Sequence, residues 1–181
     1  MTKFKRTSQE LVADHNFFKV VTNYTQVEET QEIFDRISID HIGAVAVIPI
    51  LANGDIVLID QYRSTIDDYS LEAVAGRRDV EGEEPGDCAL RELQEEVGVK
   101  SDRVESLGWI YTSPGFTNEK LFLFIALDCD DPQEPSPVGV EEKYAKTIRC
   151  TFEDALNWIN EGKIRDSKSI VAIIRAYEYC K

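Results

Sequence analysis

The segment RELQEEVGV, residues 91–99, places Glu92, Glu95 and Glu96 within five residues of a helical pattern. Residues four apart are neighbours on a helix surface, so the carboxylates of Glu92 and Glu96 repel each other by about 0.2–0.5 kcal/mol. Arg91 can pair with Glu95 at the same spacing, which leaves Glu92 and Glu96 uncompensated. A hard divalent cation such as Mg²⁺ meets this need, because it takes carboxylate oxygens and fills its other positions with water and substrate phosphates.

A longer pattern surrounds this cluster: Gly76, six residues, Glu83, seven residues, and then RELQEEVGV. It resembles the signature of Nudix hydrolases, G-x5-E-x7-R-E-U-x-E-E-x-G-U, where U is a bulky aliphatic residue. Every specified position from Glu83 onward matches, and the spacer RRDVEG holds six residues rather than five. Because the spacer precedes the helix, we expect the loop to absorb the extra residue without rotating the glutamates off their face.

The resemblance implies a set of metal ligands and helper residues. Mg²⁺ is the expected ion, with Mn²⁺ as the alternative. Glu95 is expected to share metal binding or to pair with Arg91, and Glu83 is expected to orient Arg91 or a metal-bound water. The implied ligands are the backbone carbonyl of Ala75 and the side chains of Glu92, Glu95 and Glu96.

A general base is expected on a loop before the last strand. In similar enzymes a glutamate at this place activates the attacking water. The segment VGVEEKYAKTIRC occupies the equivalent place here, before TFEDALNWINEGKI. Glu141 is therefore the leading candidate for the base, and Glu142 is the second.

Two further segments resemble the ADP-ribose pyrophosphatase branch of the family. The stretch LIDQYRSTIDDYSLEAVAG contains its Q-x-R and E-x-x-A-G patterns, which implies that Arg63 and Glu72 contact substrate. A structural Arg–Glu pair at a strand end is the alternative. The stretch SPGFTNEK resembles the S-P-G-x-x-x-E segment, which implies substrate contacts for Pro114, Gly115 and Glu119; a plain turn also explains the Pro-Gly pair.

The implied activity is metal-dependent hydrolysis of the pyrophosphate bond of a nucleoside diphosphate sugar, with ADP-ribose giving AMP and ribose 5-phosphate. GDP-mannose or a UDP-sugar is the alternative substrate. A Nudix-fold module that senses a nucleotide without cleaving it is an alternative of another class, which the six-residue spacer permits. Retention of Arg91 and all the box glutamates favours an enzyme.

The elements that position these residues are read from hydrophobic periodicity and turn signals. In the last helix Ile170, Ile173, Ile174 and Tyr177 recur at helical spacing, which predicts core positions. Strands followed by interspersed helices predict an α+β fold, an α/β/α sandwich with a mixed sheet flanked by helices and an N-terminal β extension. Strands are predicted at residues 17–24, 33–39, 42–51, 56–62, 69–74, 104–111, 120–127 and 146–150, and helices at 85–97, 152–160 and 169–179.

Composition limits the partners. The 181 residues carry a net charge of −14, which disfavours nucleic acid and anionic membranes. No run approaches the ~18 apolar residues of a membrane span, and the polar N-terminus predicts a cytoplasmic protein. Residues 41–181 are expected to form the Nudix domain, and residues 1–40 to shape the base pocket and form a homodimer. The expected reduced, packing thiols are Cys88, Cys129, Cys150 and Cys180.

Overall fold

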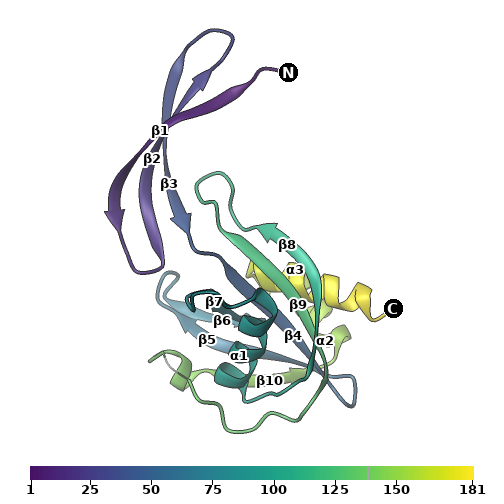
Figure 1. The fold of residues 1–181 in the computed structure, drawn as a ribbon. Coiled ribbons are helices and arrows are strands. Elements are labelled where there is room, and N and C mark those ends of the chain that lie inside the picture. Colours follow the sequence, from purple (N-terminus) through teal and green to yellow (C-terminus); the bar gives the residue numbers. More distant parts are fainter. Residues whose placement is uncertain (138) are drawn as a thin grey trace. The chain divides into compact units, whose positions relative to one another are not determined.

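The computed structural model describes residues 1–137 and 139–181 (Figure 1). The chain forms two compact units. Unit 1 comprises Met1–Gly43 and Tyr111–Lys120, and unit 2 comprises Ala44–Ile110 and Leu121–Lys181. The segment expected as an N-terminal extension therefore lies in unit 1, together with a loop from the middle of the chain.

Unit 1 is built on a three-stranded antiparallel sheet in the order β1-β2-β3. Its strands are β1 (Phe4–Asp14), β2 (Phe18–Val27) and β3 (Ile33–His41). The strands predicted at residues 17–24 and 33–39 are confirmed as β2 and β3, but β1 was missed. Ten of the eleven residues of β1 are exposed, so the strand has no buried face to produce an alternating pattern, and pairing with β2 alone identifies it.

Unit 2 is built on a seven-stranded sheet whose main path runs β10-β5-β4-β9-β8, with β6 paired to β5 and β7 paired to β4. The pairing of β4 with β9 is parallel and that of β4 with β5 is antiparallel, which confirms the predicted mixed sheet. The strands are β4 (Ala44–Leu51), β5 (Ile56–Arg63), β6 (Asp68–Glu72), β7 (Val74–Arg77), β8 (Arg103–Tyr111), β9 (Lys120–Cys129) and β10 (Lys146–Cys150).

The predicted strand at residues 69–74 is in fact two strands. β6 pairs with β5, whereas β7 pairs with β4, and Ala73 stands between them. The Ala73 amide donates to Ser169 Oγ at 2.7 Å instead of to a neighbouring strand. The chain therefore changes its pairing partner from β5 to β4 at Ala73. This change places Ala75 and Gly76 on β7, beside the first helix.

Helices cover both faces of the unit 2 sheet, so the predicted α/β/α sandwich is confirmed. They are α1 (Pro85–Val97), α2 (Phe152–Asn160) and α3 (Ser167–Tyr179), with a short 3₁₀ turn η1 (Glu142–Tyr144). Leu93 and Val97 of α1 pack with Val45 and Val57 in one core cluster. Ala155 of α2 and the inner face of α3 pack in a second cluster, against alternate residues of the same strands.

Local capping signals mark the ends of the helices. Pro85 opens α1, and Gly98 ends it in the left-handed conformation with φ 64°. The capping box of Thr151 and Asp154 is present at α2. Helix α3 begins two residues earlier than predicted, capped by Asp166, and Ile174 is 43% exposed rather than in the core. Ala172 and Ala176 occupy the buried face instead, because small side chains let the helix approach the sheet.

All four cysteines are free thiols, as predicted. Cys88, Cys129 and Cys150 are buried, but Cys180 is exposed, so the packing role expected of it is wrong. None of the helices in the described part of the chain is long and apolar enough to cross a membrane.

Candidate active site

The inner face of α1 carries two buried carboxylates. Glu92 and Glu96 are only 9% and 8% exposed, and both lie against β7. Glu96 Oε2 accepts a hydrogen bond from the Ala75 amide at 3.1 Å. A Cβ added to Gly76 would lie 1.8 Å from Glu92 Cδ, so only glycine leaves room for the Glu92 carboxylate at this point of β7.

Arg91 connects the remaining glutamates of the box. Its guanidinium donates two bonds to Glu83, from Nε to Oε1 at 2.9 Å and from Nη2 to Oε2 at 3.1 Å. Arg91 Nη1 donates to Glu92 Oε1 at 2.7 Å and to Glu95 Oε2 at 3.1 Å. The expectation that Glu92 has no positive partner is therefore wrong, because the planar fork of its neighbour reaches three carboxylates at once.

The six-residue spacer forms a loop between β7 and α1. Glu83 closes a turn by donating its amide to the Val80 carbonyl at 3.2 Å, and Gly82 adopts a positive φ of 78°. The two residues that flank the spacer both contact α1. Gly76 leaves room for the Glu92 carboxylate, and Glu83 accepts a hydrogen bond from Arg91. With six residues in the spacer, Glu92 and Glu96 still lie on the inner face of α1.

Burial makes the two inner carboxylates hard to ionise. It raises the pKa of Glu92 to about 7, against the opposing effect of Arg91. Burial also raises the pKa of Glu96 to about 8, against the bond from Ala75, and the charges of Glu92 and Glu142 raise it further. By contrast, hydrogen bonds from Arg91 lower the pKa of Glu83. Burial therefore disfavours the charged forms of Glu92 and Glu96 despite the nearby Arg91 and Arg63, and a bound divalent cation would relieve this condition.

The donor set fits a hard ion. Within the described residues, no three His, Cys, Asp or Glu side chains already stand together as a finished metal centre. Mg²⁺ does not need one, since it usually binds one or two protein carboxylates and keeps water and phosphate in its other positions. Glu92 and Glu96 would supply these carboxylates.

These pKa shifts predict how the stability of the metal-free protein depends on pH. Native Glu92 and Glu96 hold protons that the unfolded chain releases near pH 4.5, so the unfolding free energy falls as pH rises from about 5 to 8. Thermal unfolding in EDTA should show a falling midpoint over this window, and Mg²⁺ should raise the midpoint more at pH 8 than at pH 5.5. Equal Mg²⁺ effects at both pH values would contradict the assignment of these carboxylates as ligands.

Arg63 and Glu72 form a partly buried ion pair that is reinforced by Lys168 of α3. Arg63 donates to Glu72 from Nε at 3.0 Å and from Nη2 at 2.6 Å, and Lys168 Nζ binds the same carboxylate and Asp166. Burial alone would raise the pKa of Glu72, but Arg63 and Lys168 together lower it to about 2. The Arg63 charge also acts on Glu96, so this pair borders the glutamate face.

The structure accommodates both interpretations of this pair. Arg63 holds Glu72 structurally, yet 37% of its side chain remains exposed and available to a substrate. Lys168 was not predicted from the sequence, because it lies 96 residues from Glu72 in the chain. It belongs to the charged segment RDSK at the start of the last helix, and nothing in that segment identifies Glu72 as a partner.

The two candidate bases differ in environment. Glu142, in the first position of η1, is half-buried, accepts a bond from the Gly139 amide at 2.7 Å and acts electrostatically on Glu96. Glu141 is exposed and lines a separate cavity with Tyr62, Tyr69 and Tyr144. The electrostatic effect of Glu142 on the pKa of Glu96 favours Glu142 over Glu141, the candidate that the sequence ranked first.

Pro114, Gly115 and Glu119 belong to unit 1. Their loop runs along β3, where the Ile39 amide donates to the Phe116 carbonyl at 2.7 Å and the Asn118 amide donates to the Ile39 carbonyl at 3.2 Å. Pro114 and Gly115 line a cavity of about 290 Å³. Glu119 does not line it and instead accepts a hydrogen bond from Thr112 Oγ1 at 2.5 Å.

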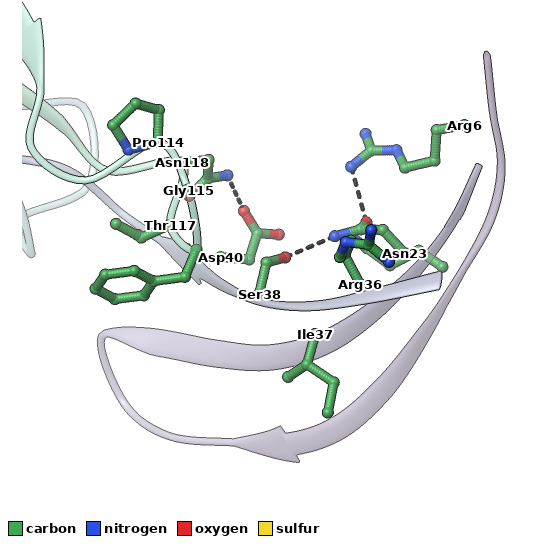
Figure 2. A pocket seen from close by; sticks show the side chains of 12 residues that line it. Arg6, Asn23, Arg36, Ile37, Ser38, Asp40, Pro114, Gly115, Thr117 and Asn118 are labelled. Carbon is green, nitrogen blue, oxygen red and sulfur yellow. Dashed lines mark hydrogen bonds between the residues drawn. The ribbon is translucent and has the colours of Figure 1, made fainter. Parts of the chain in front are cut away.

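Eight of the twelve residues that line this cavity are polar or charged (Figure 2). Asn23 accepts a bond from Arg6 Nη1 at 3.1 Å and donates to Ser38 Oγ at 2.6 Å, and Asn118 donates to Asp40. The residues of β1, β2 and β3 that form these bonds come from the N-terminal segment expected to shape a base pocket. The lining of the cavity therefore contains both hydrogen-bond donors and hydrogen-bond acceptors.

Comparison with known proteins identifies the family. The model of the NUDIX domain matches residues 40–171. An ADP-ribose pyrophosphatase of Bacillus subtilis (strain 168) is 31% identical over 173 residues, covering 93% of this chain and 92% of the relative. This chain is a member of the Nudix family. The resemblance to Nudix hydrolases drawn from residues 76–99 is confirmed.

Two further relatives have names other than ADP-ribose pyrophosphatase. A methanol dehydrogenase activator of Bacillus methanolicus is 37% identical over 133 residues, covering 74% of this chain and 71% of the relative. A GDP-mannose pyrophosphatase of Yersinia pestis (strain Pestoides F) is 32% identical over 155 residues, covering 82% and 75%. The crystal structure of an ADP compounds hydrolase superposes with a TM-score of 0.81 at 20% identity, covering 98% of this chain and 94% of that one, which supports the Nudix fold.

Proposed function

We propose that this chain hydrolyses the pyrophosphate bond of a nucleoside diphosphate sugar, with ADP-ribose giving AMP and ribose 5-phosphate. The observation that carries the proposal is the buried pair of Glu92 and Glu96 on α1, held against β7 by Ala75 and Gly76. The ADP-ribose and GDP-mannose pyrophosphatases among the relatives support this class of substrate.

The metal site is proposed to consist of Glu92 and Glu96, with Glu95 and the Ala75 carbonyl as further donors. Mg²⁺ is the proposed ion, with Mn²⁺ as the alternative. Divalent ions held there would offset the charge of the diphosphate and lower the pKa of water. Arg91 would hold Glu83, Glu92 and Glu95 in place, since it already donates hydrogen bonds to all three.

The remaining residues would handle the substrate and the proton. The exposed part of Arg63 is positioned to donate hydrogen bonds to a phosphate oxygen, while Glu72 and Lys168 fix its orientation. Glu142 would take the proton of the attacking water, with Glu141 as the alternative. As water adds to one phosphorus, the bridging oxygen would leave with the other phosphate.

Unit 1 is proposed to recognise the base and to join two copies of the chain. Pro114 and Gly115 line its polar cavity, and Glu119 supports their loop. The sheet of unit 1 exposes apolar side chains that a second copy would cover, among them Leu11 at 55% and Ile37 at 64% exposure. A homodimer in the cytoplasm, acting on a small molecule rather than on nucleic acid or membrane, remains our proposal.

The test is a substrate panel with and without Mg²⁺. Phosphate release after coupling to a phosphatase should be metal-dependent and fastest with ADP-ribose among ADP-ribose, GDP-mannose and a UDP-sugar. Faster turnover of GDP-mannose would overturn the base assignment but keep the reaction class. Binding of ADP-ribose without turnover of any member would favour the nucleotide-sensing module over the enzyme.

A further inference from the structure

The first turn of α3 contains a buried hydroxyl that binds a backbone amide 96 residues away in the chain. Ser169 Oγ accepts a hydrogen bond from the Ala73 amide at 2.7 Å, and both residues are fully buried. Ala73 stands between β6 and β7, where the chain changes its pairing partner from β5 to β4. A buried amide without a partner is costly, so the Ser169 hydroxyl stabilises the chain at this change of pairing.

Asp166 fixes the direction in which the Ser169 hydroxyl donates. Asp166 is the N-cap of α3, and its Oδ2 accepts hydrogen bonds from the Ser169 amide, at 3.0 Å, and from the Ser169 hydroxyl. A serine hydroxyl has one proton to donate, and an ionised carboxylate can only accept. The Ser169 proton therefore lies toward Asp166, which leaves an oxygen lone pair for the Ala73 amide. Lys168 Nζ, at 2.7 Å from the same carboxylate oxygen, offsets the charge of Asp166.

The residues that follow Ala73 contact both glutamates on the inner face of α1. The Ala75 amide donates to Glu96 Oε2 at 3.1 Å, and Gly76 leaves room for the Glu92 carboxylate. Ala73 and Ala75 are two residues apart, which is about 7 Å along an extended chain. Helices α1 and α3 pack in different core clusters on opposite faces of the sheet. This short segment is therefore held by α3 from one face and by α1 from the other.

We propose that Ser169 is a positioning residue for the metal site on α1. Through the Ala73 amide it fixes the start of β7, the strand that binds Glu96, makes room for Glu92 and carries the Ala75 carbonyl. The inference rests on the proposed function, because the ion concerned is the one proposed for hydrolysis. Ligands have to be held within about 0.5 Å of their productive positions, so a shift of this segment weakens metal binding even where the fold persists.

The decisive variant is Ser169→Ala, which leaves the Ala73 amide buried without its partner. Calorimetry with Mn²⁺ is the readout, because it measures metal binding without any substrate. Loss of a residue that supports metal ligands costs about 10–100-fold in metal affinity. Ser169 acts through the backbone, so the dissociation constant for Mn²⁺ should rise about tenfold, the lower end of that range. The Mg²⁺ concentration for half-maximal turnover of ADP-ribose should rise by the same factor, with kcat at saturating Mg²⁺ unchanged.

Two further variants separate positioning from general stability. Thr151→Ala is the matched control, since it also removes a buried-turn hydroxyl oxygen that accepts a backbone amide, that of Asp154 at 3.1 Å, but at the cap of α2. It should lower the thermal midpoint and leave the dissociation constant for Mn²⁺ as in the parent. Ser169→Cys keeps a weak acceptor and should give a constant between those of the parent and Ser169→Ala. It decides the question if Ser169→Ala does not fold.

Parent-like Mn²⁺ binding by the folded Ser169 variants would overturn the inference. An equal rise of the dissociation constant in Thr151→Ala would overturn it too, because general destabilisation would then explain the loss. If the parent binds Mn²⁺ but cleaves no member of the substrate panel, the proposed function fails, and the same comparison of dissociation constants still decides the role of Ser169. If the parent binds no divalent ion, the inference and the proposed function both fail.

Discussion

Glu96→Gln should abolish most turnover of ADP-ribose while leaving the fold intact. Glutamine has nearly the volume of glutamate, and its side-chain oxygen can still accept the bond from the Ala75 amide. The substitution removes only the charge that would hold a divalent ion. Charge stabilisation by a metal supplies several kcal/mol, and each 1.36 kcal/mol is tenfold in rate, so kcat/KM should fall about 100-fold or more.

A second readout separates this loss from misfolding. Because Glu96 is buried with a pKa of about 8, the uncharged variant should be at least as stable as the parent in EDTA at pH 8 and should gain less from Mg²⁺ on heating. Glu153→Gln, an exposed glutamate on α2, is the matched control and should keep full activity. Parent-like turnover by Glu96→Gln at saturating Mg²⁺ would refute the metal platform on α1.

Glu142→Gln should cause the other large loss, and Glu141→Gln a small one. General base catalysis contributes about 10²–10⁴-fold, so removal of the base should lower kcat by about 100-fold or more. Glutamine at position 142 can still accept the bond from the Gly139 amide, so the turn is expected to survive. Glu141 is exposed and lines the separate cavity with Tyr62, Tyr69 and Tyr144. Glu141→Gln should therefore lower kcat by less than about tenfold.

The pH profile distinguishes a base from a structural residue. Without a base, hydroxide must replace it, so the activity of Glu142→Gln should climb with pH across the range where the parent levels off. Circular dichroism and the thermal midpoint should match those of Glu141→Gln. If Glu141→Gln instead shows the larger loss of kcat and the dependence on hydroxide, Glu141 is the base, as the sequence ranked it, and Glu142 is not.

Local sequence determined α1 and much of its chemistry. Pro85 and Gly98 mark its ends, Leu93 and Val97 recur at the helical period, and the glutamates follow from the same spacing. These features depend on residues a few positions apart, so the sequence contains all the information they need. The hydrophobic pattern also predicted most of the strands, but it joined β6 and β7 into one strand, and it missed β1 because almost none of β1 is buried.

Only the tertiary structure decided what surrounds the glutamates. The change of pairing partner at Ala73 between β6 and β7 places Gly76 beside Glu92, Lys168 binds Glu72 from 96 residues away, and the charge of Glu142 raises the pKa of Glu96. Each depends on how distant segments pack, and spacing along a chain does not encode the path that brings them together. The sequence by itself thus determined the glutamate-bearing helix α1 and the family of the chain. The tertiary structure decided which residues surround Glu92 and Glu96. It also raised the pKa values of these two carboxylates, because burial and neighbouring charge are properties of the packed chain.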